Sequence, residues 1–289
     1  MKTCIMAVLL ISSVALAIEP SIIPRPTSLK TTGGGYTITA QATIQCDAAF
    51  KNEADYLAQT LRTAAGFELK AGSDAGIRLR KIDDKSLGAE GYRLSINAKR
   101  IEISAVAPAG AFYGIQTLLG MLAPEVVSPK PVSGVKWVAS GVEIVDKPNF
   151  PWRAFMLDEA RNFKGEKEVK KLLDSMARCK MNVFQWHLTD DQGWRIEIKK
   201  YPELSEKSAW CVDRTEEPWK KQSPIQPGEK ATYGGYYTQD EIRDVIQYAS
   251  DRNILVIPEI EMPGHTSEVF AAFPNLSCKG DTLPVNPGS

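Results

Sequence analysis

Three short apolar segments in the second half of the chain each end in charged side chains, and this repetition constrains the fold more than any other feature. The segments cover residues 152–160, 183–188 and 254–261, and they are separated by amphipathic patterns at residues 166–180 and from Thr238 onward. Alternating strands and helices with unbroken apolar strands indicate a parallel sheet that is covered by helices. We therefore predict successive βα units in this half of the chain.

Charged side chains follow the C-terminal end of each segment. They are Asp158 and Arg161 after the first segment, His187 and Asp190 after the second, and Glu259, Glu261 and His265 after the third. One such strand end is unremarkable, because a pair such as Asp190–Asp191 can simply turn the chain. Three in succession predict the reaction face of a TIM (β/α)8 barrel, whose active site lies at this end of the strands.

The length of this half limits how much of a barrel the sequence can supply. A complete barrel needs about 250 residues, which is more than residues 148–289 provide. We expect about three βα units of an incomplete barrel here, and a chain that is truncated at its C-terminus. Pro258, within the third segment, predicts a bulge or bend in that strand.

Residues 18–147 have the pattern of a compact α+β domain. We predict strands at residues 36–40, 43–46, 77–82, 91–96, 100–104 and 135–145. Two helices are predicted, one that Asp47 caps and Gly66 ends, and one between Pro108 and Pro124. No catalytic constellation occurs in this domain, so we expect it to support the incomplete barrel structurally.

The first residues and the overall charge bear on location and partners. Residues 1–17 carry one lysine, an apolar stretch and the small-residue pattern Ala15-Leu16-Ala17, which predicts a signal peptide and export to the periplasm or the exterior. With 35 basic and 35 acidic side chains, the chain has no net charge that would favour nucleic acid.

The cysteines and histidines predict no metal or cofactor. Four cysteines follow residue 17 and allow three pairings, none of which the sequence selects. Cys179 lies on the apolar side of a predicted helix, and we expect a buried thiol there. The cysteine spacing gives no zinc pattern, and His187 and His265 are the only histidines.

Four motifs in this order resemble glycoside hydrolase family 20, the β-N-acetylhexosaminidases. They are MLDEARNF (156–163), HLTDDQGWRIEI (187–198), GGYYTQDEI (234–242) and IPEIEMPGH (257–265). Residues 19–147 also resemble the small domain that precedes the barrel in this family. The resemblance implies hydrolysis of terminal, non-reducing N-acetylglucosamine or N-acetylgalactosamine from a glycan or glycoconjugate. It also implies a substrate-assisted, retaining mechanism in which the sugar's own acetamido carbonyl attacks the anomeric carbon.

In that family an adjacent Asp-Glu pair orients the acetamido group and supplies the general acid. The pair stands in an HxGGDE-like motif, which does not occur in this sequence. Asp158-Glu159 and Asp240-Glu241 lack that context. The resemblance therefore implies that the catalytic pair is absent from this chain, and that the fragment alone is inactive.

The resemblance does carry supporting residues onto this chain. Arg161 matches the arginine that holds the sugar's 3- and 4-hydroxyls, and Asp190 with His265 matches a pair beside the general acid. Arg161 could instead pair with Asp158 or Glu159, and His265 could cap a helix near Gly264.

The remaining polar and aromatic residues are assigned less specific roles. We expect Asp191 to brace its loop with Arg195, and Glu259 and Glu261 stay undecided. We expect the aromatic residues of the polar excursion at residues 205–235, with Tyr236 and Tyr237 at its end, to anchor that loop rather than to stack on sugars. A non-catalytic carbohydrate-binding protein, or an inactive remnant of this fold, is the alternative function. Linkage, oligomeric state and membrane retention stay open.

Overall fold

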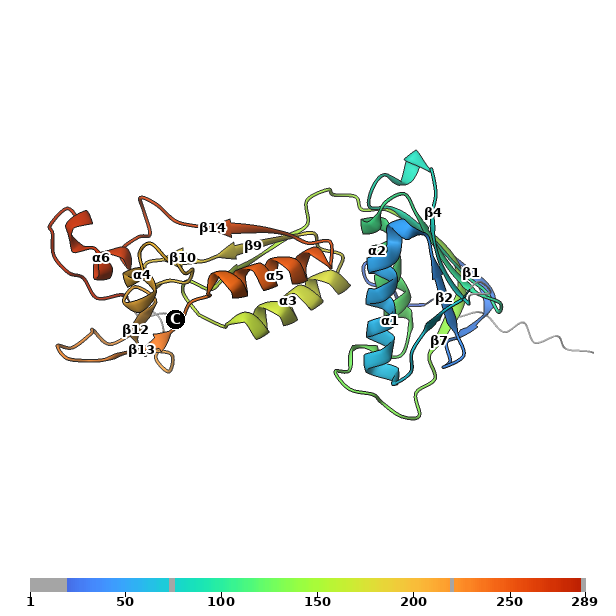
Figure 1. The fold of residues 1–289 in the computed structure, drawn as a ribbon, viewed down its shortest axis with the longest axis horizontal. Coiled ribbons are helices and arrows are strands. Elements are labelled where there is room, and N and C mark those ends of the chain that lie inside the picture. Colours follow the sequence, from blue (N-terminus) through green and yellow to red (C-terminus); the bar gives the residue numbers. More distant parts are fainter. Residues whose placement is uncertain (1–19, 73–75, 219–220, 287–289) are drawn as a thin grey trace, which may run out of the picture.

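The computed structural model describes residues 20–72, 76–218 and 221–286, which form two lobes (Figure 1). The signal peptide predicted at residues 1–17 lies outside the described residues. Within those residues, no helix combines the length and the apolar character that crossing a bilayer requires.

The first lobe is a mixed seven-stranded sheet with two helices on one face. The strands run in the order β1-β7-β5-β6-β4-β2-β3. Their bounds are β1 (Ser28–Thr37), β2 (Thr43–Cys46), β3 (Lys70–Ala71), β4 (Ile77–Lys81), β5 (Tyr92–Ile96), β6 (Ile101–Ala105) and β7 (Val138–Asp146). Helices α1 (Lys51–Ala65) and α2 (Pro108–Met121) cover the face that looks toward the second lobe (Figure 1). Single 3₁₀ turns lie at Ala48–Phe50, Lys85–Leu87 and Pro124–Val127.

Most of the predicted elements of this lobe are present, and β1 is the main exception. The strand predicted at residues 36–40 instead spans Ser28–Thr37. Its pairing with β7 is irregular between Thr31 and Gly35, where Gly33 and Gly34 adopt positive φ angles of 75° and 67°. These glycines interrupt the alternating side-chain pattern that would mark a strand in the sequence, because the register slips across them.

Helix α2 is buried on nearly all sides, because it lies between the sheet and the neighbouring helices. Its residues from Gly110 to Leu119 are all buried, as expected for an apolar helix in a core. A methyl group on Gly114 would come within 2.6 Å of the Ile103 side chain. The glycine therefore permits the close packing of α2 on β6.

The second lobe contains a parallel three-stranded sheet in the order β14-β9-β8. Its strands are β8 (Ala154–Asp158), β9 (Val183–His187) and β14 (Leu255–Glu259). Helices α3 (Glu166–Arg178) and α5 (Gln239–Ser250) lie side by side on one face (Figure 1). The parallel βα order is as predicted, and the assignment of these units to the first part of a TIM barrel remains a prediction.

Two expectations for this lobe are wrong. Pro258 causes no bulge, because it pairs in regular register with Trp186 on an edge strand, where a missing N–H needs no partner. Cys179 is exposed rather than buried, because α3 ends at Arg178 and the cysteine lies in the cap beyond it.

The connections between these strands hold the remaining short elements. They are β10 (Thr189–Asp190), β11 (Gly193–Trp194), α4 (Glu203–Glu206), β12 (Trp210–Val212), β13 (Ala231–Gly234), α6 (Val269–Ala272) and the 3₁₀ turn Pro274–Leu276. Tyr237 of the excursion is buried, and its ring packs on Trp186 with 4.7 Å between centroids. The hydroxyl of Tyr233 donates to Asn162 at 2.6 Å. These two aromatic residues anchor the loop, whereas Trp219 lies outside the described residues.

Two ion pairs, whose partners are mostly shielded from solvent, fasten the lobes together. Lys180, which follows α3, donates to the Asp146 carboxylate at 3.1 Å and to the Tyr92 hydroxyl at 2.9 Å. Arg153, which precedes β8, donates to Glu90 at 2.7 Å. Both pairs join residues of the first lobe to the N-terminal ends of the barrel-like elements, so they fix how the two lobes meet.

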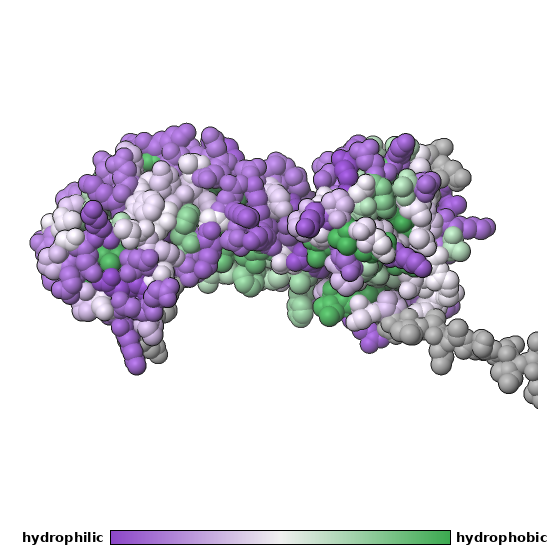
Figure 2. All heavy atoms as spheres, turned by 90° about the horizontal axis from the view of Figure 1, so that it is seen from below, coloured by the Kyte–Doolittle hydropathy of each residue, from purple (hydrophilic) through white to green (hydrophobic). Residues whose placement is uncertain are grey.

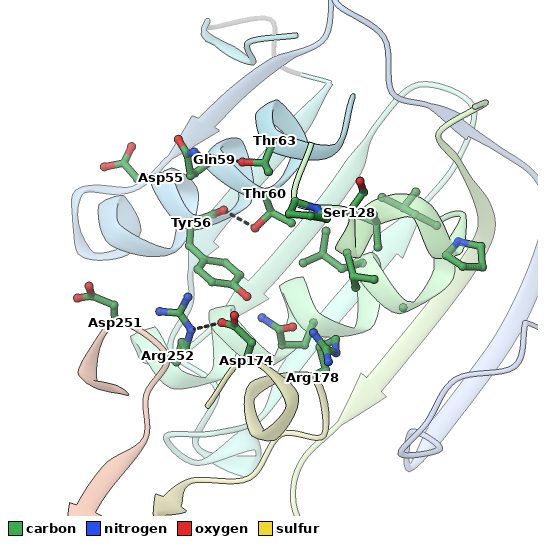
Figure 3. A pocket seen from close by; sticks show the side chains of 18 of the residues that line it. Asp55, Tyr56, Gln59, Thr60, Thr63, Ser128, Asp174, Arg178, Asp251 and Arg252 are labelled. Atoms are coloured by element: carbon green, nitrogen blue, oxygen red, sulfur yellow. Dashed lines mark hydrogen bonds and ion pairs between the residues drawn. The ribbon is translucent and has the colours of Figure 1, made fainter. Parts of the chain in front are cut away.

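A hollow of about 1030 Å³ opens at this junction, and α1, α2, α3 and α5 line it (Figure 3). Within it, Arg252 donates to Asp174 at 2.7 Å and lies 3.3 Å from the centre of the Tyr248 ring. Hydrophobic residues gather on the first lobe near the junction, whereas the second lobe is mostly hydrophilic in this view (Figure 2). Arg252 precedes β14, so the hollow lies at the strands' N-terminal end, where barrels carry stability rather than chemistry.

Candidate active site at the strand ends

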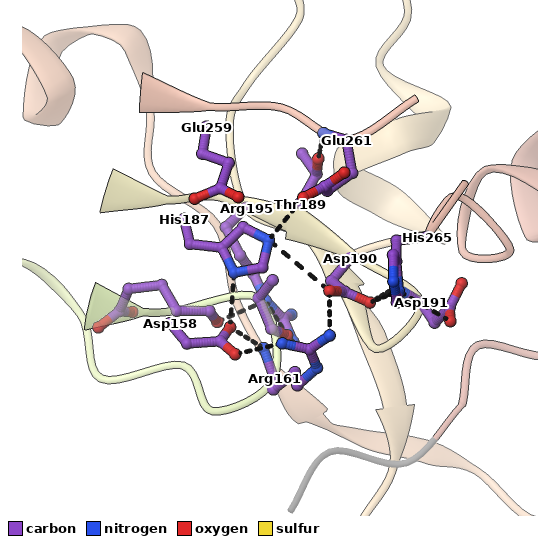
Figure 4. Close-up of polar contacts among 12 residues, drawn as sticks. Asp158, Arg161, His187, Thr189, Asp190, Asp191, Arg195, Glu259, Glu261 and His265 are labelled. Carbon is purple, nitrogen blue, oxygen red and sulfur yellow. Dashed lines mark hydrogen bonds and ion pairs between the residues drawn. The ribbon is translucent and has the colours of Figure 1, made fainter. Parts of the chain in front are cut away.

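The charged residues predicted from the sequence meet at the C-terminal ends of the three parallel strands. Asp158, His187 and Glu259 are the last residues of β8, β9 and β14, and they lie abreast, because each pairs in register with the next. The loops that follow bring Arg161, Asp190 and His265 to the same place (Figure 4). Parallel strands in register therefore explain how residues more than a hundred positions apart converge.

Arg161 lies between two carboxylates. One terminal nitrogen, Nη1, donates to Asp158 Oδ2 at 2.7 Å, and the other, Nη2, pairs with Asp190 Oδ2. The Asp158 ion pair considered from the sequence is therefore present, and a second carboxylate joins it. The Arg161 side chain retains 27% of its exposure. It is thus held by the protein while part of the guanidinium still faces solvent.

Glu159, the other partner considered for Arg161, is used elsewhere. Its carboxylate accepts from the Tyr237 hydroxyl at 2.8 Å and from the backbone N–H of Lys164 at 2.8 Å. The residue is fully buried. Burial raises the pKa of the Glu159 carboxyl, although these hydrogen bonds oppose the effect.

Asp190 and His265 contact each other, as expected from their places after neighbouring strands. His265 Nδ1 lies 3.1 Å from Asp190 Oδ1. Asp190 is 1% exposed, whereas the His265 side chain is 56% exposed. His265 has a positive φ of 53°, and it caps no helix, because the cap residue of α6 is Glu268. A buried carboxylate thus orients a histidine that reaches the surface.

His187 lies at the centre of the group, and no specific role was predicted for it beyond its place at a strand end (Figure 4). Its ring is 5% exposed, with Nδ1 at 3.4 Å from Asp158 and Nε2 at 3.6 Å from Asp190 and 3.8 Å from Glu261. Hydrogen bonding to Asp158 raises the pKa of His187, although burial opposes the rise. Burial by itself would raise the pKa of Asp158, but His187 and Arg161 outweigh burial, so the pKa of Asp158 is lowered.

The predicted pairing of Asp191 with Arg195 is wrong. Asp191 Oδ1 accepts from the backbone and the hydroxyl of Ser267, at 3.1 and 2.8 Å. Arg195 is fully buried, and among the described residues it donates to backbone carbonyls alone. These carbonyls belong to Glu159, Ala160, Gln192, Ala209 and Gly235. The sequence could not indicate this, because carbonyl acceptors leave no residue pattern.

The two undecided glutamates have different surroundings. Glu259 accepts from the Gln185 side chain at 2.5 Å, which occupies one carboxylate oxygen. The Glu261 carboxylate lies near His187, and its backbone N–H donates to the Thr189 hydroxyl at 2.9 Å. Both belong to the group at the strand ends. Among the described residues, neither glutamate forms a hydrogen bond or an ion pair with Arg161.

Two sets of side chains in the described part of the chain could each gather around a cation. They are His187, Glu259 and Glu261, and Asp190, Asp191 and His265, whose ligand atoms lie within 4.8 Å of one another. In both sets the side chains already bind protein partners: Glu259 binds Gln185, Asp191 binds Ser267, and His265 binds Asp190. We assign no metal to either.

Two family models match the chain. The model described as glycosyl hydrolase family 20, catalytic domain, matches residues 150–287, and the model described as domain 2 of the same family matches residues 19–147. Among curated proteins, a beta-hexosaminidase of Porphyromonas gingivalis is 42% identical over 264 residues, which are 89% of this chain and 32% of that protein. A beta-N-acetylhexosaminidase of Cellulomonas fimi is 30% identical, over 93% of this chain and 51% of its own length.

Solved structures agree with these sequence matches. A Streptomyces plicatus beta-hexosaminidase variant in complex with the product GlcNAc superposes with a TM-score of 0.82 and 36% identity, over 94% of this chain and 53% of that one. A beta-N-acetylhexosaminidase of Bacteroides fragilis gives a TM-score of 0.74 and 31% identity, over 92% and 49% of the two chains. The chain thus spans between about a third and about half of the length of these relatives.

Proposed function

Because the chain belongs to glycosyl hydrolase family 20, we propose that it forms part of a β-N-acetylhexosaminidase. The proposed reaction removes terminal, non-reducing N-acetylhexosamine residues from glycans or glycoconjugates. N-acetylglucosamine is the sugar that we favour, since a similar Streptomyces plicatus structure holds it as the product. The leader-like residues 1–17 support export as a further part of this proposal.

The observation that carries the proposal is the position of Arg161. Its guanidinium has five N–H donors in a planar fork, and Asp158 and Asp190 engage one terminal nitrogen each. Donors remain for a ligand, and the side chain is partly exposed at the end of the strands where barrel enzymes bind substrate. A fork of this kind suits two neighbouring oxygens, such as the 3- and 4-hydroxyls of a sugar.

The Asp190–His265 pair supports a role beside the reacting bond. A carboxylate that accepts from one ring nitrogen fixes the orientation of an imidazole and leaves the other nitrogen for a second partner. In the proposed mechanism, that partner is the general acid or a group bound to it. The attacking group is the substrate's own acetamido oxygen, so the enzyme needs no protein nucleophile.

No HxGGDE-like motif occurs in the 289 residues. We propose that the general acid and the acetamido-orienting aspartate are contributed by sequence other than this chain. The chain alone should then fail to hydrolyse a chromogenic N-acetyl-β-glucosaminide. A chimera in which the chain replaces the aligned part of the Porphyromonas gingivalis relative should hydrolyse it.

The two proteins together decide between the candidate functions. Turnover by the purified chain alone would show that the catalytic groups have been misplaced. A folded chimera that binds N-acetylglucosamine without turnover would favour a non-catalytic carbohydrate-binding protein. The matched control is the unmodified relative, expressed and assayed in the same way.

A further inference from the structure

The buried imidazole of His187 is not used by the proposed mechanism, yet it contacts the groups that hold Arg161. We propose that His187 is a positioning residue, which closes a ring of alternating charges with Asp158, Arg161 and Asp190 and thereby fixes the arginine's orientation. The value of this ring for sugar binding rests on the proposed function. Its existence and its charge do not.

The ring is closed on both sides (Figure 4). On one side, Arg161 spans the two carboxylates, with Nη1 at 2.7 Å from Asp158 and Nη2 paired with Asp190. On the other side, His187 spans the same carboxylates, with Nδ1 at 3.4 Å from Asp158 Oδ1 and Nε2 at 3.6 Å from Asp190 Oδ2. Each carboxylate therefore lies within ion-pair distance of both nitrogen-bearing groups, and neither ring nitrogen of His187 makes a hydrogen bond with the described residues.

The position of His187 in the fold explains why it can bridge. It ends the central strand β9, and its register partners are Asp158 on β8 and Glu259 on β14. Asp190 follows three residues later, after the chain has turned into the β10 strand. The imidazole is therefore flanked by strand ends on either side and by its own loop in front, with 5% of its surface exposed.

The charged groups around the His187 imidazole favour its doubly protonated form, the imidazolium. Asp158 from β8, Asp190 from the loop after β9, and Glu259 and Glu261 from β14 and its end are all acidic, whereas Arg161 is the one cation among them. With His187 charged, the four ring members sum to zero. With His187 neutral, one buried negative charge is left without compensation, which is costly where water is excluded.

The protonation state of His187 also decides to how many carboxylates its two nitrogens can donate. A neutral imidazole has one N–H donor, whereas an imidazolium has two. Only the imidazolium can donate toward Asp158 and Asp190 at once. Loss of that proton removes one of these two contacts and so weakens the hold on the carboxylate that orients the corresponding nitrogen of Arg161.

The test uses the fact that the chain has only two histidines. The protein is labelled with ¹³C,¹⁵N-histidine, and the ring nitrogen shifts, which separate neutral from doubly protonated imidazole, are followed by NMR between pH 5 and pH 9. His265→Gln removes one set of signals and so assigns the other. We expect His187 to remain doubly protonated above the ordinary histidine pKa of about 6.5.

Asp158→Asn should lower the midpoint of the His187 titration by about one pH unit or more, because it removes a neighbouring charge. Asp240→Asn is the matched control, since Asp240 is 89% exposed and pairs with Arg243 on the surface of α5. This measurement reports the charge of the His187 imidazole. A merely structural role of His187 would not make that charge depend on Asp158.

A singly protonated His187 at pH 6 in the unmodified protein would overturn the proposal. The proposal would also be overturned if Asp158→Asn shifted the midpoint of the His187 titration no further than Asp240→Asn does. If Asp158→Asn does not fold, the titration of the unmodified protein decides alone. No sugar is present in these measurements, so their failure would leave the proposed hydrolase function standing, and failure of the hydrolase assay would leave the ring standing.

Discussion

At the scale of single residues, Glu268 is the most unusual side chain near the site. It is fully buried, and neither carboxylate oxygen has a hydrogen-bond partner among the described residues. Burial raises the pKa of Glu268 to about 8, and the nearby charges of Asp191 and Asp190 act in the same direction. At neutral pH the folded protein therefore keeps this carboxyl protonated.

The raised pKa of Glu268 makes folding stability fall as pH increases. The unfolded chain releases this proton near pH 4.3, whereas the folded chain keeps it up to about pH 8. Between these values the folded state binds more protons, so each step up in pH favours unfolding. Glu268→Gln should therefore match the unmodified protein at pH 4 and exceed its unfolding free energy by at least about 1 kcal/mol at pH 8.

Denaturant unfolding at several pH values checks this difference. Glu206→Gln serves as a control, because Glu206 is an exposed residue at the end of α4. A gap between Glu268→Gln and the unmodified protein that does not change with pH would mean that the carboxyl is ionised in the folded state.

Asp190 and His265 should act as one unit, since their side chains lie 3.1 Å apart and only Asp190 is buried. In the active chimera, Asp190→Asn, His265→Phe and the double variant form a cycle that is scored on kcat/KM. If the two residues share one role, either single variant already removes it. The fall in kcat/KM of the double variant should then be clearly smaller than the product of the two single falls. Multiplicative losses would show that the two residues work independently.

At the scale of elements, most helices and strands follow from local pattern. Thr238 and Glu241 form the capping box that their spacing indicates, and α5 starts there. The strand ends also converge as predicted, because parallel register places them abreast. The pattern could not indicate the glycine-interrupted start of β1, and it could not indicate the contacts of His187 with Asp158 and Asp190, because these partners come from different elements.

Arg195 links several loops of the second lobe. Its guanidinium joins the loop after β8 to β11 and to the β12–β13 excursion through backbone carbonyls. It lies against Gly193, where a methyl group would come within 2.1 Å of the guanidinium carbon. Sequence could not indicate this arrangement, because it depends on three loops meeting in space.

Arg195→Lys should destabilise the second lobe, because an ammonium cannot reach carbonyls on several sides as the planar fork does. We expect a loss of about 2–4 kcal/mol in the free energy of unfolding, from lost hydrogen bonds to a buried charge. Denaturant titration measures it, with Arg243→Lys as the exposed control. Equal stability of the two variants would contradict the linking role.

At the scale of the whole molecule, the lobes are joined by ion pairs whose partners on both sides are mostly shielded from solvent. Lys180 enters the first lobe and meets Asp146, with 11% and 13% of their side chains exposed. Burial lowers the pKa of Lys180 despite Asp146, and the pKa of Asp146 is lowered even though burial raises it, because Lys180 lies beside it. The attraction between Lys180 and Asp146 offsets the large cost of removing both charges from water, so the pair contributes little net stability. Removing one partner is costly, because it leaves the other charge shielded from water without compensation.

Lys180→Met should therefore destabilise the junction by roughly 3–5 kcal/mol, since it leaves Asp146 buried without its cation. The additional change Asp146→Asn should restore part of the loss. Limited proteolysis at residues 147–153 reports opening of the junction, and denaturant unfolding reports its free energy. If the single variant is as resistant to cleavage as the unmodified protein, the lobes are held by other contacts.

The proposal that these strand ends place Arg161 to bind a substrate sugar is tested by the kinetics of an Arg161 variant. In the active chimera, Arg161→Lys keeps the charge but loses the fork, so kcat/KM for a chromogenic N-acetyl-β-glucosaminide should fall about tenfold to hundredfold, the equivalent of one charged hydrogen bond. Arg243→Lys on the surface should leave kcat/KM unchanged. Unchanged kinetics in Arg161→Lys would show that the guanidinium serves only its ion pairs with Asp158 and Asp190.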